Sequence, residues 1–394
     1  LHVRSRRQRQ MCIRDRIDGA LWVGNIEIHT HSSDWFRHGH HSDKAYDSVI
    51  LHVVSEADTE ITRSNGEQIP QLLLTCPENV QLHYHELCVA DHYPACYPIL
   101  VSLPKLTIHS WLTALQTERL EQKAQLITQR LALCNRNWED AFFITLARNF
   151  GFGLNGDAFE TWAGLLPFRA MDKHRNDLFQ IEAFFYGLAG LLEETFLKKE
   201  QEDEYSLRLC KEFRYLQRKF EIGQGMDATL WRFLRLRPEN FPHIRLAQLA
   251  YLYQKGDKLF SRLLEAETLA DVRALLDTRT SPYWENHYLF GRLSSQKEKT
   301  MGERSKDLII INTVVPFLYT YGLHKADERM CERAGRFLEE LKAESNHIIR
   351  SWSDAGLPVV SAADSQALIQ LQKEYCDKRK CLYCRFGYEY LRKK

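Results

Sequence analysis

The alternation of apolar and polar residues changes character near residue 80. Before that point the pattern mostly has a period of two, which is typical of strands with one buried face. In residues 21–29 (LWVGNIEIH), the polar side chains of Asn25, Glu27 and His29 fall on one face and apolar side chains on the other. Residues 49–54 (VILHVV) form a nearly continuous apolar run, which predicts a strand buried on both faces. This part of the chain predicts a small mixed sheet.

Two connections of this sheet carry turn signals. In the polar connector over residues 30–48, we expect Ser42 to cap a short helix that carries Ala45 and Tyr46. Residues 61–63 and 68–74 flank Asn65-Gly66, and this dipeptide predicts a hairpin with a type I′ turn.

After about residue 82 the apolar residues recur at helical spacing. The predicted helices include residues 111–131, 138–150, 178–194 and 208–220, with Gly151 as a stop and with Gly187 and Gly190 allowing close helix approach. No fixed internal period is present, which excludes a solenoid of regular repeats. We therefore expect an α+β protein with a truncated sheet domain over residues 17–80 and a larger all-helical domain over residues 81–394.

The composition is that of a folded protein, because 44% of the 394 residues are hydrophobic and 27% are charged. The formal charge of +1 forces no bulk attraction to nucleic acid or to a membrane. No apolar run approaches the roughly 18–20 residues of a membrane span, so we expect no membrane association. The ten cysteines lack the spacing of a small disulfide-rich domain, which indicates reduced thiols in a cytoplasmic protein.

Residues 1–16 (LHVRSRRQRQMCIRDR) differ from the rest of the chain, with six arginines and no apolar period. One interpretation is a basic arm that binds nucleic acid. The string QMCIRDR is also typical of translated adaptor sequence, and we favour a non-native leader joined to a truncated reading frame. We expect the natural sequence to begin upstream, and residues 1–16 carry no functional argument.

Glu27 and His29 are the first candidate site, because residues two apart in a strand share a face. A strand carboxylate with a polar partner two residues later is the arrangement of many metal-dependent phosphodiesterases. Mg²⁺ or Mn²⁺ bound at Glu27 would activate water and offset charge on a phosphate. The alternative is that both side chains line the solvent face of an edge strand.

A histidine-rich connector is the second candidate. His38, His40 and His41 surround Gly39, and imidazole is a favoured zinc ligand. The alternative is a solvated loop. Further candidate ligands nearby are Asp34, Asp43 and His52.

The C-terminal cysteines are the third candidate. Cys376, Cys381 and Cys384 include a C-x2-C pair, the spacing found in zinc and iron–sulfur sites. Three thiolates are one short of a closed tetrahedral site, and Cys96 is the expected fourth ligand. The alternative is a set of reduced, partly buried thiols.

A cluster of arginines, Arg232, Arg235, Arg237 and Arg245, is the fourth candidate. Planar guanidinium groups beside aromatic residues suit phosphate contacts and base stacking, so nucleic acid is a possible partner. Helical arginines that pair with acids across helices produce the same string. The sequence names no protein partner.

Six strings resemble, in order, the bacterial family catalogued as domain of unknown function 2851, over about residues 17–394: LWVGNIEIHTHSSDW, HSDKAYDSVILHVV, ARNFGFGLN, RLRPENFPHIRLAQLA, AADSQALIQL and YCDKRKCLYC. The family name assigns no activity. The resemblance implies a Gly-Pro-Asp-Phe strand upstream of residue 17, and in outline this is similar to the PD-(D/E)xK nuclease core. Glu27 would then match the metal-binding glutamate, whereas His29 stands where that superfamily usually has lysine. With the upstream aspartate absent, this chain would hold half a metal site and be inactive.

Three hypotheses follow. The first is a nuclease-like phosphodiesterase domain joined to a helical domain that binds substrate or a partner. The second is a non-catalytic binding or scaffold protein. The third is a zinc-dependent hydrolase that uses the histidine cluster.

Overall fold

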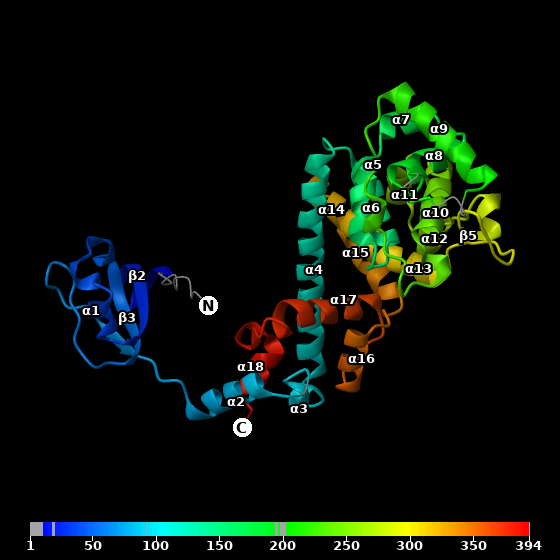
Figure 1. Cartoon of the computed structure of the whole chain (residues 1–394). Coiled ribbons are helices and arrows are strands. Elements are labelled where there is room, and N and C mark those ends of the chain that lie inside the picture. Colours follow the sequence, from blue (N-terminus) through cyan, green and yellow to red (C-terminus); the bar gives the residue numbers. More distant parts are fainter. Residues whose placement is uncertain (1–10, 18–19, 92, 194–195, 198–201, 394) are drawn as a thin grey trace. The chain divides into compact units, whose positions relative to one another are not determined.

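The computed structural model describes residues 11–17, 20–91, 93–193, 196–197 and 202–393. The chain forms two compact units, whose elements are labelled in Figure 1. Unit 1 comprises Leu1–Ile99 and Cys381–Lys394, and unit 2 comprises Leu100–Lys380. We describe each unit by itself. Residues 1–10 of the predicted leader lie outside the described residues, and its last residues belong to the first strand.

Unit 1 begins with a four-stranded mixed sheet in the order β1-β2-β3-β4. The strands are β1 (Met11–Ile17), β2 (Ala20–His31), β3 (Val49–Glu56) and β4 (Gln71–Leu73). β1 is antiparallel to β2, whereas β2 and β3, and then β3 and β4, run parallel. Hence β2 pairs with β1 over its first half, whereas Glu27 and His29 pair with β3 alone among the described residues.

The crossover from β2 to β3 carries α1 (Asp34–Arg37), η1 (His40–Ser42) and η2 (Lys44–Tyr46). Trp35 anchors the crossover, because its indole is fully buried with Val49, Ile61 and Ile69. The Trp35 Nε1 donates to the Thr62 carbonyl at 3.0 Å. The crossover is therefore held against the sheet, and it carries most of the predicted histidines. We use "sheet domain" below for β1 to β4 with this crossover.

One local prediction in the sheet domain is wrong, and another is confirmed in part. Asp43, not Ser42, caps the short helix, since its side chain accepts from the Ala45 amide at 2.9 Å. The predicted turn at Asn65-Gly66 is present and is closed by the antiparallel bridge Thr62↔Gln68, but only Gly66 has a positive φ, so the turn is not of type I′. The residues after the turn do not continue the hairpin but form β4, which pairs in parallel with β3. A proline at position 70 has no amide hydrogen to continue an antiparallel ladder.

The C-terminal residues of the chain pack on a helix near the start. Unit 1 also contains α2 (Glu78–Val89), most of α3 (Tyr97–Leu100), η9 (Cys381–Tyr383) and α18 (Arg385–Leu391). Glu86 of α2 accepts from the Tyr390 hydroxyl at 2.9 Å and from Lys393 Nζ at 2.8 Å. Unit 1 therefore contains residues from both ends of the chain, and it extends to Ile99, whereas the sequence predicted a boundary near residue 80.

Unit 2 is almost entirely helical. Its α-helices are α4 (Lys105–Leu133), α5 (Trp138–Phe150), α6 (Gly156–Gly164), α7 (Phe168–Asp172), α8 (Leu178–Leu188), α9 (Glu204–Phe220), α10 (Pro242–Lys255), α11 (Leu259–Glu265), α12 (Leu269–Leu275), α13 (Glu303–Ile309), α14 (Val315–Lys325), α15 (Glu328–Glu340), α16 (His347–Asp354) and α17 (Ala362–Gln370). Short elements are η4 (Ala228–Leu230), η5 (Pro238–Asn240), η6 (Pro282–Glu285), β5 (His287–Leu289) and β6 (Arg292–Leu293). Two π-helical segments, η7 (Ile310–Val314) and η8 (Leu371–Cys376), continue α13 and α17.

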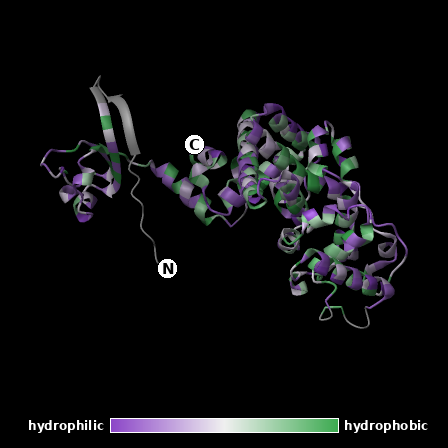
Figure 2. Ribbon diagram, turned by 90° about the horizontal axis from the view of Figure 1, so that it is seen from above, coloured by the Kyte–Doolittle hydropathy of each residue, from purple (hydrophilic) through white to green (hydrophobic). Residues whose placement is uncertain are grey.

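Most helices of unit 2 form where the apolar spacing predicted them, but the predicted helix over residues 178–194 ends at Leu188, and Gly190 lies in the turn after it with a φ of +71°. Asn137 caps α5 by accepting from the amides of Glu139 and Asp140, and α5 ends at Phe150 before Gly151, as predicted. Gly187 lets α9 approach α8, because a Cβ there would lie 2.3 Å from the Phe213 ring. Hydrophobic residues gather where these helices face one another (Figure 2). A small sheet followed by helices is therefore confirmed. Among the described residues, no helix has the length and apolarity that a membrane span requires.

Candidate metal centre

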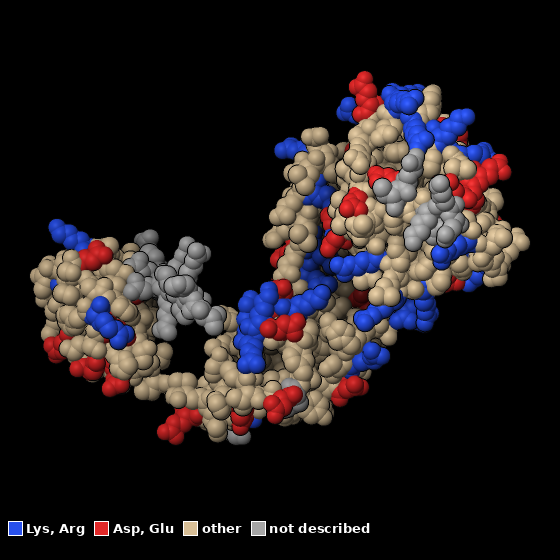
Figure 3. Space-filling view, in the orientation of Figure 1, with Lys and Arg blue, Asp and Glu red and all other residues tan. Residues whose placement is uncertain are grey.

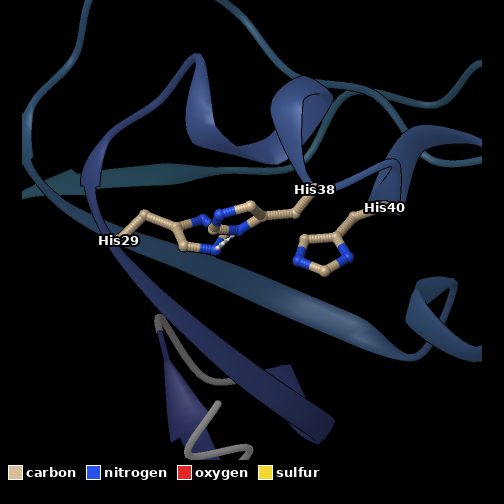
Figure 4. Close-up of side chains that lie close together, drawn as sticks. All are labelled: His29, His38 and His40. Atoms are coloured by element: carbon tan, nitrogen blue, oxygen red, sulfur yellow. Dashed lines mark hydrogen bonds between the residues drawn. The ribbon is translucent and has the colours of Figure 1, made fainter. Parts of the chain in front are cut away.

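Three imidazoles converge in the sheet domain, as Figure 4 shows. His29 projects from β2, His38 follows α1, and His40 begins η1. One nitrogen from each ring lies within 4.8 Å of those of the other two, which makes these residues a group able to hold a metal ion. We call them the imidazole cluster.

Local structure explains this convergence. Strand alternation places His29 on the same face as Glu27, two residues earlier. Gly39 stands between the other two histidines with a φ of +76°, a conformation that favours glycine. The turn at Gly39 ends α1 and starts η1, so both His38 and His40 face β2. Their rings contact each other edge to face, with centroids 5.5 Å apart.

The distances within the imidazole cluster suit a small cation. The His38 Nδ1 and the His29 Nε2 are 3.2 Å apart. Two ligand nitrogens at about 2.0–2.1 Å from a tetrahedral zinc ion are separated by about 3.3 Å. The His40 ring stacks on that of His29, with centroids 5.4 Å apart and 10° between the planes.

His52 on β3 supports His29 from the neighbouring strand. The register of the two strands pairs Glu27 with His52, and the His29 Nδ1 lies 2.9 Å from the His52 Nε2. Metal-binding histidines usually donate their second ring N–H to a hydrogen-bond acceptor such as a carboxylate, a carbonyl or water. Here the His52 Nε2 lies at the position of that acceptor. Burial, followed by the nearby imidazoles, lowers the pKa of both His29 and His52 to about 4. Both rings are therefore neutral at pH 7, which is the form that binds a metal.

Glu27 is the acidic member of the site. Its side chain is 1% exposed, and its Oε1 lies 3.6 Å from the His29 Nε2. Neither carboxylate oxygen has a hydrogen-bond partner among the described residues. Burial raises the pKa of Glu27. A buried carboxylate without hydrogen bonds costs folding free energy, and a cation at the imidazole cluster would offset that cost. The alternative in which this pair faces solvent is excluded, because the side chains of Glu27 and His29 are 1% and 5% exposed.

Tyr46 completes the wall of the site, and sequence reasoning gave it no role. Its ring stacks on that of His40 with centroids 3.7 Å apart. Burial is the main cause of the raised pKa of Tyr46, and the charge of Glu27 adds to it. The only sequence signal was its position in the predicted short helix after the histidines.

The remaining acidic candidates have structural partners. Asp34 forms an ion pair with Arg37 at 2.6 Å, and its Oδ2 accepts from the His31 amide at 3.4 Å. Asp43 caps η2, as described above. Glu27 and the imidazole cluster thus form the centre of the candidate site.

The predicted cysteine site involves both units. Cys96, Cys381 and Cys384 belong to unit 1, whereas Cys376 lies in η8 of unit 2. All four cysteines are free of disulfides. Within unit 1, Cys381 contributes to raising the pKa of Tyr84, after the stronger effect of Cys88. A shared zinc ion or iron–sulfur cluster stays a prediction.

The four predicted arginines differ in exposure. Arg232, Arg235 and Arg237 are exposed in the segment before α10. Arg245 is 6% exposed inside unit 2, where it donates to Gln248 at 2.7 Å and to Asn240 at 2.5 Å. In the folded unit Arg245 therefore acts within the core, and phosphate contacts stay a prediction for the three exposed arginines.

The sequence matches the model of a known protein family. The sequence model of the family described as "Protein of unknown function (DUF2851)" matches residues 13–347. The chain belongs to this family. The match confirms the resemblance seen in the sequence strings, and the family description names no activity. Neither the curated proteins nor the solved structures that were compared with this DUF2851 chain gave a match.

Proposed function

We propose that the sheet domain is a metal-dependent hydrolase of phosphodiester bonds. His29, His38 and His40 hold a transition metal ion, and Glu27 acts as the general base. The observation that carries the proposal is the convergence of three imidazoles beside a buried carboxylate that has no hydrogen-bond partner among the described residues.

The donor set decides between the predicted metals. Mg²⁺ prefers a shell of oxygen ligands, whereas imidazole suits zinc and neighbouring transition metals. Three imidazole nitrogens therefore favour Zn²⁺ over Mg²⁺, and Glu27 lies beside them as the base. Such an ion supplies Lewis acidity toward a phosphoryl oxygen when it is bound.

The side chains around the ion have separate tasks. His52 orients His29 through the 2.9 Å contact, which keeps the His29 Nε2 directed toward the ion. Glu27, with its raised pKa, is suited to accept the proton of the attacking water at an oxygen atom near neutral pH. Tyr46 and Trp35 fix the rings of His40 and His52 by aromatic contacts.

Phosphodiester substrates are proposed from the arrangement of the sheet. The strand with the E-x-H sequence pairs in parallel with β3, and Glu27 lies on the same face as His29 of the imidazole cluster. This supports the likeness in outline to the nuclease core that the sequence strings implied. The exposed arginines Arg232, Arg235 and Arg237 are candidate contacts for a nucleic-acid backbone.

The test is a cleavage assay of the protein with DNA and RNA, single- and double-stranded, in the presence of Zn²⁺, Mn²⁺ or Mg²⁺. We expect cleavage with Zn²⁺ and a loss of at least about 100-fold in Glu27→Gln. Glu56→Gln, which alters an exposed carboxylate on β3, is the matched control and should keep full activity.

The outcomes separate the three hypotheses. Zinc binding at His29 without cleavage of any substrate would indicate a metal-binding scaffold. Cleavage that survives Glu27→Gln would refute the assignment of the base. Failure to bind any of the three ions would refute the site.

A further inference from the structure

Unit 2 contains a cavity that the proposed function does not use. It has a volume of about 440 Å³ and lies between α4, α5, α6 and the π-helical segment η7. Cavities of roughly 300–1,000 Å³ are typical of small-molecule sites. Its polar lining includes Lys123, Arg130, Arg148 and Glu160, and we call it the cationic cavity. Lys and Arg side chains gather along α4 where this helix meets the rest of unit 2 (Figure 3).

The charges that line the cationic cavity do not balance. Arg130 donates to the Thr145 hydroxyl at 2.7 Å and also to Glu160. Arg148 donates to Asp157 at 2.7 Å and to the other oxygen of the same Glu160 carboxylate. One carboxylate therefore holds two guanidinium groups side by side. Together with Lys123, the lining carries three cations and one anion, an excess of positive charge that Asp157 partly offsets by pairing with Arg148 from outside the lining.

Lys123 contributes to this excess because its partners are neutral. Its Nζ donates to the Asn312 Oδ1 at 3.1 Å and to the Gln366 Oε1 at 2.9 Å. Burial, followed by the charge of Arg119, lowers the pKa of Lys123 to about 7, while Glu344 opposes this effect. An anion in the cavity would stabilise the charged form of this ammonium.

Hydrogen bonds hold the part of the cavity lining that contains Asn312 in a fixed position. Asn312 lies within η7, and short π-helical segments inside helices occur frequently at functional sites. The Asn149 Nδ2 donates to the Asn312 carbonyl at 3.0 Å and to the Thr313 hydroxyl at 2.8 Å. These bonds tie η7 to α5 and fix the amide that accepts from Lys123.

Part of the lining is apolar. Leu126, Ile127 and Leu133 lie on α4, the helix that also carries Lys123 and Arg130, and Pro316 lies on α14. Leu126 and Leu133 are 60% and 85% exposed, so a ligand of this cavity meets cations and exposed apolar side chains and needs both a charged group and an apolar part.

We propose that the cationic cavity binds a small phosphate monoester with an apolar substituent. A phosphate monoester carries a charge of about −1.5 to −2 at pH 7, which is opposite in sign to Lys123, Arg130 and Arg148 of the lining. Guanidinium groups bind phosphate oxygens in a bidentate manner, and an ammonium group adds a point charge. The proposal does not depend on the metal centre of unit 1.

The experiment is calorimetric titration of the full chain with phenyl phosphate, and with phenol as the uncharged comparison. We expect saturable binding of one phenyl phosphate per chain and no binding of phenol. Lys123→Met should weaken binding by at least about tenfold, because it removes one charge-assisted contact. Glu160→Gln should tighten binding several-fold, because it removes the carboxylate that competes for both guanidinium groups.

Matched variants keep the outcome interpretable. Lys105→Met removes an exposed lysine at the start of the same helix and should leave the affinity unchanged. If Lys123→Met fails to fold by circular dichroism, the opposite effect expected of Glu160→Gln decides. The proposal is overturned if phenyl phosphate does not bind the wild-type chain at about 10 mM. It is also overturned if Glu160→Gln binds no more tightly than the wild type.

Discussion

A buried glutamate in unit 2 makes stability depend on pH in an unusual direction. Glu182 lies in α8 with its side chain 0% exposed, and it accepts a hydrogen bond from the Tyr205 hydroxyl. Desolvation outweighs the hydrogen bonds from Tyr205 and Ser281, so that the pKa of Glu182 rises from 4.5 to about 7. The folded state therefore binds this proton more tightly than the unfolded state does.

The size of this effect on the free energy of unfolding follows from the pKa of Glu182 in the unfolded state, 4.5, and in the folded state, about 7. The contribution of Glu182 to stability is complete below pH 4.5, and it is lost as the pH rises through about 7. Between pH 5 and pH 8 this one group should lower the free energy of unfolding by roughly 2–3 kcal/mol. Glu182→Gln removes the titrating group and should remove that part of the slope.

The assay is urea unfolding of the wild type and Glu182→Gln at several values between pH 5 and pH 8, followed by tryptophan fluorescence. The stability of the variant relative to the wild type should rise by roughly 2–3 kcal/mol across this range. Glu265→Gln, at the exposed end of α11, is the control and should follow the wild type. The reasoning is refuted if the difference between wild type and Glu182→Gln is independent of pH.

Further predictions concern the site and the packing of unit 2. His52→Phe keeps a ring beside His29 but removes the 2.9 Å contact, so zinc affinity should fall about 10- to 100-fold in a chelator competition. Equal affinities would contradict the orienting role. Gly190→Ala would place a Cβ 2.2 Å from the Met226 carbonyl oxygen at a φ of +71°, so we expect unit 2 to lose roughly 1–3 kcal/mol in urea unfolding. Gly223→Ala, where a Cβ meets open space, should cost less, and an equal loss would argue against the clash.

The sequence predicted the helices and the central pair of the site because both follow local rules. Helical spacing located α5 and its end at Gly151, and strand alternation put Glu27 and His29 on one face. These features depend on residues close in sequence.

Other features depend on contacts between residues that are distant in the sequence, and they could not be predicted from the sequence. His52 meets His29 only through the register of β2 and β3, and the stacking of Tyr46 on His40 depends on how the crossover folds back. The cationic cavity joins Lys123 and Arg148 from two helices with η7, whose π-helical hydrogen bonding has no periodic signal in the sequence. Likewise, the turn at Asn65-Gly66 follows its local signal, but the parallel pairing of the next residues with β3 depends on the rest of the sheet.

Zinc titration by calorimetry tests the central claim most directly, with His38→Ala compared with His41→Ala. Both residues are exposed in the same crossover, but only His38 belongs to the imidazole cluster. We predict that His38→Ala binds one equivalent of zinc fewer than the wild type and that His41→Ala binds the same number as the wild type. Equal zinc binding by His38→Ala and the wild type would contradict the assignment of a metal centre to the imidazole cluster.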